Sequence, residues 1–292
     1  MHAYLPAIGF GQIKKKSQLQ QLLSSVQNFP DQVQKIRLDE ESSLVVYTKK
    51  VAPDIGLMIC GEEDMQGSFQ MEYYEPYINS NVCSSKAECS IEKESAREAY
   101  DGVCDDCRLG LNLIFSVNNF MEYRKYQVLQ GFFPTVTDAC LSALCTQGKI
   151  LLPILKRPEA ARIAKKKEQG RQQLIEAARE GNQEAIDSLT IDDMNLSNKV
   201  GRLLNSCDIY TMVESSIMPC GMESDRYTII GEILNVVPLV NEISKEPLCQ
   251  MDVKCNNICV RVLVNRSGLM GEPMTGRRFK GDIWLQGVVN FV

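Results

Sequence analysis

Acidic side chains gather at three places in the first half of the chain, where they could bind a divalent cation or transfer protons. These carboxylates are Glu62, Glu63, Asp64, Glu72, Glu75, Asp105 and Asp106. Mg²⁺ prefers oxygen ligands, and paired carboxylates can serve as general acid and base. Acidic residues are also common in solvated turns, and Glu62 to Asp64 lead into a predicted turn. A metal-dependent enzyme built on Glu72, Glu75 and Asp105 is therefore one alternative function.

Four cysteines form two pairs, Cys83-x5-Cys89 and Cys104-x2-Cys107. A C-x2-C pair can give two thiolates to zinc, and a second pair would complete a tetrahedral site. The first pair has the wrong spacing for a zinc knuckle. Cys107 leads into a predicted strand, whereas a thioredoxin-type pair begins a helix. Zinc binding by these thiols stays open, and no cofactor is expected.

Histidine occurs once, at His2. Ser–His–Asp or Cys–His catalysis, or a zinc hydrolase with an H-E-x-x-H motif, would have to use this residue in a segment that is expected to fray. The chain contains no G-x-x-x-x-G-K-[ST] phosphate loop and no complete G-x-G-x-x-G motif. These observations favour a protein that is not an enzyme.

A basic run between Lys156 and Arg171 stands out in a chain whose formal net charge is −5. Its charges could neutralise phosphate groups of a nucleic acid, together with basic residues near the end of the chain. The residues expected to bind nucleic acid are Lys165, Lys166, Lys167, Arg171, Arg277, Arg278 and Lys280. A solvated helix face is the alternative explanation of such a run.

Trp284 is the only tryptophan, and we expect it on the outward side of its strand. An exposed tryptophan would suit an interface with a protein partner, so a structural or assembly protein is another alternative. Single-stranded nucleic acids usually stack on aromatic side chains. Residues 248–255 and 258–264 contain no aromatic residue, which weakens the nucleic-acid hypothesis.

Length and composition indicate two domains, since 292 residues with 44% hydrophobic content can bury two cores. No apolar run approaches the roughly 18–20 residues of a membrane span, and the first residues do not resemble a secretory signal. The twelve cysteines are then expected to be reduced thiols. We expect a cytoplasmic protein that does not enter a membrane.

Residues 222–292 are predicted to form a small β-barrel of the OB type. Asn256-Asn257 suits a tight hairpin, because asparagine tolerates left-handed backbone. Alternation predicts these inward-facing side chains: Cys249, Met251, Val253, Cys255, Ile258, Val260, Val262, Val264, Phe279, Ile283, Leu285, Val289 and Phe291. A long strand, a meander and a returning strand resemble an OB-type Greek-key barrel, with another small antiparallel sheet as the alternative.

Residues 1–155 are predicted to form a mainly antiparallel α+β domain. Leu19, Leu22, Leu23 and Val26 predict one face of a helix that begins near Ser17. A second helix is expected over 88–100. Strands are expected at 3–10, 44–47, 55–60, 69–77, 109–117, 136–144 and 149–154, with the last two joined as a hairpin by Thr146-Gln147-Gly148.

Residues 156–221 are predicted to form a helical connector between these two domains. Pro158 suits the start of its first helix, and Gly181 suits the end. Asn182 is expected to cap a second helix, and further helices are expected before Pro219. The predicted fold class is therefore α+β, with an N-terminal α+β domain, a central helical connector and a C-terminal OB-like barrel.

Several short strings together suggest a family. They are Met1-His2-Ala3-Tyr4-Leu5, Met71-Glu72-Tyr73-Tyr74-Glu75-Pro76-Tyr77, Gly148-Lys149-Ile150-Leu151-Leu152-Pro153-Ile154, Gly271-Glu272-Pro273, Gly276-Arg277-Arg278-Phe279-Lys280-Gly281 and Trp284-Leu285-Gln286-Gly287. Over nearly its whole length the chain resembles an uncharacterised family, a domain of unknown function, of similar length from Gram-positive, Clostridia-like bacteria. The resemblance implies a bacterial intracellular protein and supplies no catalytic residue.

The favoured function is a non-catalytic intracellular binding module that holds nucleic acid through the basic helix and the OB-like barrel. Binding of a protein partner through the barrel and a metal-dependent enzyme are the alternatives.

Overall fold

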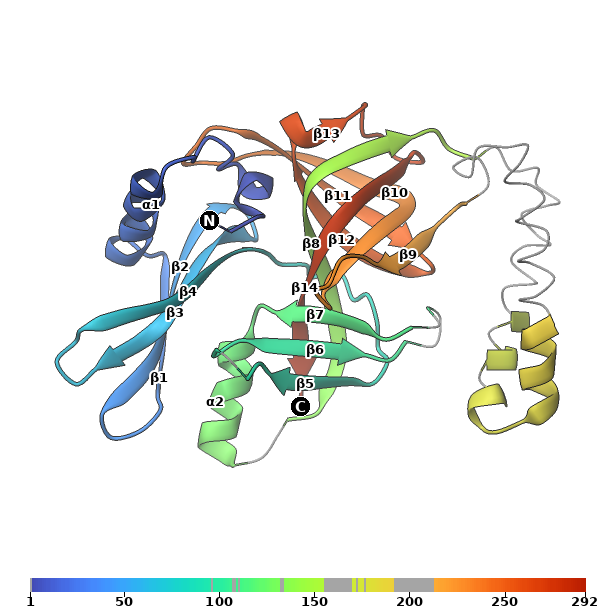
Figure 1. Cartoon of the computed structure of the whole chain (residues 1–292), viewed down its shortest axis with the longest axis horizontal. Coiled ribbons are helices and arrows are strands. Elements are labelled where there is room, and N and C mark those ends of the chain that lie inside the picture. The colour runs from blue at the N-terminus through green and yellow to red at the C-terminus, as the bar shows by residue number, and fades with distance from the viewer. Residues whose placement is uncertain are drawn as a thin grey trace.

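The computed structural model of the chain describes residues 2–95, 97–106, 109, 111–131, 134–154, 170–171, 173–175, 177–191 and 213–292. Strands predominate over helices and form a four-stranded and a ten-stranded sheet (Figure 1). The predicted α+β character is confirmed at this level, and the predicted division into 1–155, 156–221 and 222–292 stays a prediction. None of the helices in these ranges is long and apolar enough to cross a membrane.

The four-stranded sheet is an antiparallel meander of β1 (Gln32–Arg37), β2 (Ser42–Ala52), β3 (Ile55–Asp64) and β4 (Phe69–Ile78). The strands predicted at 44–47, 55–60 and 69–77 are confirmed. β1 was not predicted, because its sequence of mostly polar residues shows no apolar alternation.

α1 (Lys16–Asn28) contacts β2 and β3 and buries the predicted stripe of Leu19, Leu22, Leu23 and Val26. The strand predicted at 3–10 is wrong, because these residues form a 3-10 helix, η1 (Leu5–Ile8). Pro6 lies in its first turn, where a missing N–H costs nothing, and Gly9 ends it with a φ of 94°.

The ten-stranded sheet contains all the other strands. They are β5 (Cys89–Lys93), β6 (Tyr100–Cys104), β7 (Leu113–Val117), β8 (Val136–Leu151), β9 (Ser216–Pro219), β10 (Arg226–Val240), β11 (Pro247–Cys255), β12 (Ile258–Asn265), β13 (Leu269–Met270) and β14 (Arg278–Phe291). α2 (Phe120–Gln130) follows β7, and the short 3-10 helix η3 (Arg266–Gly268) follows β12. Figure 1 shows β5, β6 and β7 beside the lower end of β14.

Five strands of this sheet form a closed cycle of pairings. β8 pairs in parallel with β12 and antiparallel with β14. The cycle is completed by the antiparallel pairs β12–β11, β11–β10 and β10–β14. β8 therefore joins the first half of the chain directly to strands that follow residue 225.

The alternation predicted for the last third of the chain is confirmed. All the predicted inward-facing side chains are buried in one hydrophobic cluster, apart from Phe291, which packs against that cluster. Asn256 and Asn257 both have left-handed φ angles, 42° and 67°, as a tight hairpin between β11 and β12 requires.

The hairpin predicted within 136–154 is wrong, because β8 is one continuous strand of 16 residues. Thr146-Gln147-Gly148 has the composition of a turn, but β14 pairs with β8 from Val136 to Leu151. Gly148 satisfies a packing requirement instead, since an added Cβ would lie 2.5 Å from Cε2 of Phe279.

The helix predicted over 88–100 is also wrong. The charged residues between Glu92 and Glu98 are good helix formers, so local propensity favours a helix. In the structure they lie around the connection between β5 and β6, which pair with each other. Pairing of β6 with β7 extends the large sheet and outweighs the local preference.

Part of the predicted connector is described. Gly181 has a φ of 87°, and Oδ1 of Asn182 accepts a hydrogen bond of 3.2 Å from the backbone N of Ala185, which confirms both predicted helix boundaries. β9 adds a strand within the range that was predicted to be helical. The other predicted helices of this range lie outside the described residues, apart from helical residues at 170–171, 173–175, 177–179 and 183–191.

Candidate functional site

The site that we call the lysine groove is a surface hollow of about 770 Å³ where β8, β10, β13 and β14 meet. Lys149 of β8 and Lys280 of β14 line it, together with Thr228 of β10 and Asp282 of β14. Three glycines also line it: Gly148, Gly268 and Gly281.

Lys149 and Lys280 lie directly opposite each other on the antiparallel strands β8 and β14. Lys149 is exposed and Lys280 is half-buried. Like charges at directly opposed positions of a sheet destabilise the pairing. An anion bound between the two ammonium groups would interact favourably with both.

Asp282, the acidic residue that lines the groove, accepts a hydrogen bond from a neighbouring strand. Oγ1 of Thr228 donates a hydrogen bond of 2.6 Å to Oδ1 of Asp282 on the neighbouring strand. Asp282 follows Lys280 by two residues on β14, and Thr228 lies on the adjacent strand β10. The groove therefore carries two opposed cations beside a carboxylate whose orientation is fixed.

Of the predicted basic residues, Lys280 lies in the groove, and the two arginines before it have other partners. Nη1 of Arg277 donates to the carbonyl oxygen of Glu272 at 2.8 Å. Arg278 is buried, and its guanidinium donates to the carbonyl oxygens of Leu152 and Val213 at 3.0 and 2.5 Å. Arg278 thus joins the residue that follows β8 to Val213, near the end of the predicted connector.

The basic residues of the connector are described only in part. Lys165, Lys166 and Lys167 lie outside the described residues, and Arg171 is exposed on a helical segment. Lys149 was not among the predicted residues. The alternation of β8 could have placed it on an outward face, had the turn-like Thr146-Gln147-Gly148 not suggested a break.

Trp284 is buried, so the expectation that its side chain is exposed is wrong, and its role in binding a partner stays a prediction. Its side chain does point away from the cluster that Ile283 and Leu285 enter, as predicted. The rings of His2 and Tyr4 cover it, with centroids 4.8 and 5.5 Å away. Its indole N–H donates to the carboxylate of Asp225.

A second hollow of about 500 Å³, the acidic cleft, lies beside this cover. Its charged lining residues are Glu75, Glu94, Arg97, Asp101, Glu223, Asp225 and Arg226. His2 also lines it and is held in place, because its backbone N donates to the hydroxyl of Tyr74 at 2.8 Å. The expectation that this segment is frayed is wrong.

Burial changes the protonation of several groups in the acidic cleft. It lowers the pKa of His2 to about 4 and raises the pKa of Asp101 to about 6. It also raises the pKa of Glu75, whose carboxylate is 2.6 Å from Nη1 of Arg97. Asp101 gave no sequence signal, because its neighbours in the cleft come from distant segments.

The predicted carboxylate trio is not assembled. Glu75 lines the acidic cleft, Oε1 of Glu72 accepts from the backbone N of Glu98 at 3.3 Å, and Asp105 pairs with Arg179 at 2.8 Å. Within the described ranges, no three His, Cys, Asp or Glu side chains are placed to hold a metal ion together.

The predicted cysteine pairs are separated by secondary structure. Cys89 and Cys104 are opposed on β5 and β6 and are buried without forming a disulfide, and Cys83 is exposed. Cys107 lies outside the described residues. Zinc binding by all four thiols therefore stays a prediction.

Comparison with known families gives one match over most of the chain. The model described as "Domain of unknown function, E. rectale Gene description (DUF3881)" matches residues 5–287. The chain belongs to this family. The resemblance noted from the sequence is thus confirmed. No curated protein and no solved structure matches the chain.

Proposed function

We propose that this member of the DUF3881 family is a binding module that contacts the phosphate groups of a nucleic acid through the lysine groove and the basic connector. The observation that carries the proposal is the direct opposition of Lys149 and Lys280. Two ammonium groups held across a strand pair form a site that gains free energy when a phosphate lies between them.

The connector adds charge close to this pair in the sequence. The basic run begins at Lys156, only a few residues after β8 ends at Leu151. This short separation in the chain supports one shared binding surface rather than two separate ones.

The cycle of five strands supports an OB-like barrel. Counted from β10, the strands β10, β11, β12, β14 and β8 occupy the positions of strands one to five of that barrel, with the parallel pair between three and five. The fifth strand then comes first in the sequence. OB-type barrels commonly bind oligonucleotides on the face of strands two and three.

In this chain that face is partly covered. Leu248 of β11 and Leu263 of β12 are buried in the cluster that contains Leu5 and Ile8 of η1. The proposed phosphate contact therefore lies at the β8–β14 side of the cycle and does not rely on stacked bases. A cytoplasmic location forms part of the proposal, and the cysteines of the described residues, which form no disulfide, support it.

The test is fluorescence anisotropy of labelled single-stranded RNA and DNA with the purified protein at several salt concentrations. We expect the affinity to fall tenfold or more between about 50 and 200 mM salt, because phosphate contacts release counterions. The double variant Lys149→Ala/Lys280→Ala should weaken binding and reduce the salt slope by about one to two.

Lys254→Ala provides the matched control. Lys254 is exposed on β11, which pairs with neither β8 nor β14. Lys254→Ala removes one positive charge, as does each of the substitutions at Lys149 and Lys280. It should change the affinity for nucleic acid little. Absence of binding at about 50 mM salt, where electrostatic attraction is strongest, would overturn the proposal.

A further inference from the structure

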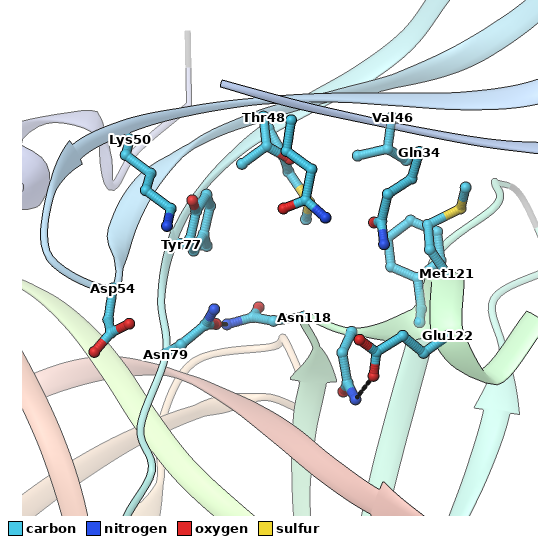
Figure 2. Close-up of a pocket in the computed structure, with 14 residues that line it drawn as sticks. Gln34, Val46, Thr48, Lys50, Asp54, Tyr77, Asn79, Asn118, Met121 and Glu122 are labelled. Carbon is cyan, nitrogen blue, oxygen red and sulfur yellow. Dashed lines mark hydrogen bonds between the residues drawn. The ribbon is translucent and has the colours of Figure 1, made fainter. Parts of the chain in front are cut away.

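A third hollow, the interlayer cleft, separates the four-stranded sheet from the segments around β7 (Figure 2). Its volume is about 190 Å³. Figure 2 shows Gln34, Thr48 and Tyr77 extending from the sheet on one side, and Asn79, Asn118 and Glu122 on the other. The cleft is distinct from the lysine groove and shares no lining residue with it.

The sheet changes from apolar to polar along the face that enters this cleft. On β2, Leu44 and Val46 are buried in the main hydrophobic cluster, whereas Thr48 and Lys50 on the same face line the cleft. β1 follows the same pattern, because Ile36 is buried opposite Leu44 and Gln34 lines the cleft opposite Val46. The polar half of this face forms one wall of the cleft, and the segments that carry Asn79, Asn118 and Glu122 form the second wall.

Hydrogen bonds fix the orientation of two amides in that second wall. Nδ2 of Asn118 donates to the carbonyl oxygen of Ile78 and to Oδ1 of Asn79, both at 2.9 Å. A backbone carbonyl can only accept, so this nitrogen and oxygen cannot be exchanged. Figure 2 shows the result: Oδ1 of Asn118 and Nδ2 of Asn79 are turned towards the cavity.

This wall is also rigidly attached to the large sheet. Asn119 pairs with Val289 of β14 through two hydrogen bonds, of 2.8 Å to its carbonyl oxygen and 3.0 Å from its backbone N. The backbone N of Asn118 donates to the carbonyl oxygen of Gly287 at 2.8 Å. The cleft therefore presents a fixed acceptor beside a fixed donor, which one hydroxyl group can satisfy at once.

The opposite wall offers groups that can adapt. The Gln34 amide and the hydroxyls of Thr48 and Tyr77 can each donate and accept. Burial raises the pKa of Tyr77, so its hydroxyl keeps its proton at neutral pH. Val46 and Met121 add apolar surface that carbon-bound hydrogens of a ligand can contact.

The charge and the volume of the cleft further limit which class of ligand can bind. Lys50, Asp54 and Glu122 are the charged lining residues, so the cleft has no strong net charge. An acceptor-only group such as a phosphate cannot donate to Oδ1 of Asn118 and is repelled by the carboxylates of Asp54 and Glu122, which outnumber the single lining cation, Lys50. A volume of about 190 Å³ equals that of about six water molecules at roughly 30 Å³ each.

We propose that the interlayer cleft binds one small, neutral polyhydroxy molecule of the size of a single sugar ring. Its hydroxyl groups bond the Asn79–Asn118 pair on one side, and Gln34 and Thr48 on the other. The site is independent of the lysine groove, so failure of either proposal leaves the other intact.

The experiment is a titration of the ¹⁵N-labelled full chain with glucose, N-acetylglucosamine and myo-inositol, followed by NMR of the side-chain amides. Each probe is added up to about 50 mM, which detects dissociation constants in the millimolar range. We expect at least one probe to shift the amide signals of Asn79 and Gln34. Glucose 6-phosphate serves as the charged comparison and should bind more weakly than glucose.

Gln34→Leu and Thr48→Val each replace a hydrogen-bonding side chain by an apolar one of similar size. Both variants leave Asn79 and Asn118 unchanged. Each should weaken binding about tenfold or more, because polar groups of the cleft then lose their partners. Gln20→Leu on the exposed face of α1 is the matched control and should leave binding unchanged. The backbone spectrum of each variant reports whether it is folded.

Three results would overturn the proposal. The first is that none of the neutral probes shifts the cleft amides. The second is binding that persists at full strength in the Gln34→Leu/Thr48→Val double variant. The third is preference for glucose 6-phosphate over glucose, which would show that the cleft selects an anion.

Discussion

Phe279 lies against Gly148 so closely that a Cβ added to the glycine would be 2.5 Å from Cε2 of the ring. Phe279 is fully buried, and the same ring restricts Gly281 on its own strand, where an added Cβ would be 2.7 Å from Cζ. The pairing of β8 with β14 thus depends on two glycines that leave space for one aromatic ring.

Gly148→Ala should therefore destabilise the protein by about 1–3 kcal/mol through overpacking. Urea denaturation followed by circular dichroism measures this change. Gly170→Ala is the control, since Gly170 is helical and no atom lies within 4 Å of its added Cβ. Combining Gly148→Ala with Phe279→Leu should recover part of the loss, and a purely additive double variant would contradict the argument.

Arg97→Ala should destabilise the protein by about 3 kcal/mol, because it leaves the buried Glu75 carboxylate without its ion-pair partner. We give the low end of the usual range because Arg97 is itself one-third exposed. Without Arg97 the pKa of Glu75 rises further, so the loss should be smaller at pH 5 than at pH 7. Arg97→Ala/Glu75→Gln should cost less than Arg97→Ala, and an equal loss at both pH values would refute this account.

His2 should make the protein less stable as the pH falls from about 6.5 to about 4. Its pKa is about 4 in the fold and 6.5 in the unfolded chain, so the unfolded state binds more protons in this window. His2→Phe keeps a ring against Trp284 but cannot titrate. Its free energy of unfolding, measured in urea at each pH, should fall less steeply than that of the unmodified protein.

Asp101 acts in the opposite direction over part of this window. Its pKa is raised to about 6, so the folded state binds more protons than the unfolded state between about pH 4 and 6, and stability falls as the pH rises. The difference between His2→Phe and the unmodified protein removes this contribution, because both contain Asp101. Parallel pH profiles for the two proteins would show that His2 is not the cause.

Tyr4→Ala should expose the indole ring of Trp284 to solvent. Trp284 is the only tryptophan, so intrinsic fluorescence reports its surroundings without interference. We expect a red-shifted emission maximum and greater quenching by acrylamide. Tyr126→Ala is the control, because Tyr126 is an exposed residue of α2. Unchanged emission in Tyr4→Ala would mean that other residues form the cover.

The sequence predicted those parts of the fold that depend on local patterns. Alternation identified the inward faces of β11, β12 and β14, and spacing identified the buried stripe of α1. Prediction from local patterns failed at β8 and β5, where long-range strand pairing outweighs a turn-like or helix-like composition. Pairing of β8 with β12 and β14 could not be predicted, because more than a hundred residues separate Leu151 from Ile258.

The candidate sites were less predictable than the fold. Lys280 was identified from its charge, but its partner Lys149 depends on the register between two distant strands. The burial of Trp284 depends on His2 and Tyr4, and no local pattern connects these residues. The interlayer cleft combines residues between Gln32 and Glu122, half of which are neutral amides and hydroxyls that give no sequence signal.

The position of β14 in the chain constrains folding during synthesis. β14 pairs with β7, β8 and β10, so the ribosome must release residues 278–291 before the large sheet is complete. Until then β8 lacks its antiparallel partner strand β14, although it pairs in parallel with β12 and β13, and Ala139 to Cys145 form an uninterrupted buried segment. An apolar strand with one open edge promotes aggregation, which makes the nascent chain a natural client for ribosome-associated chaperones.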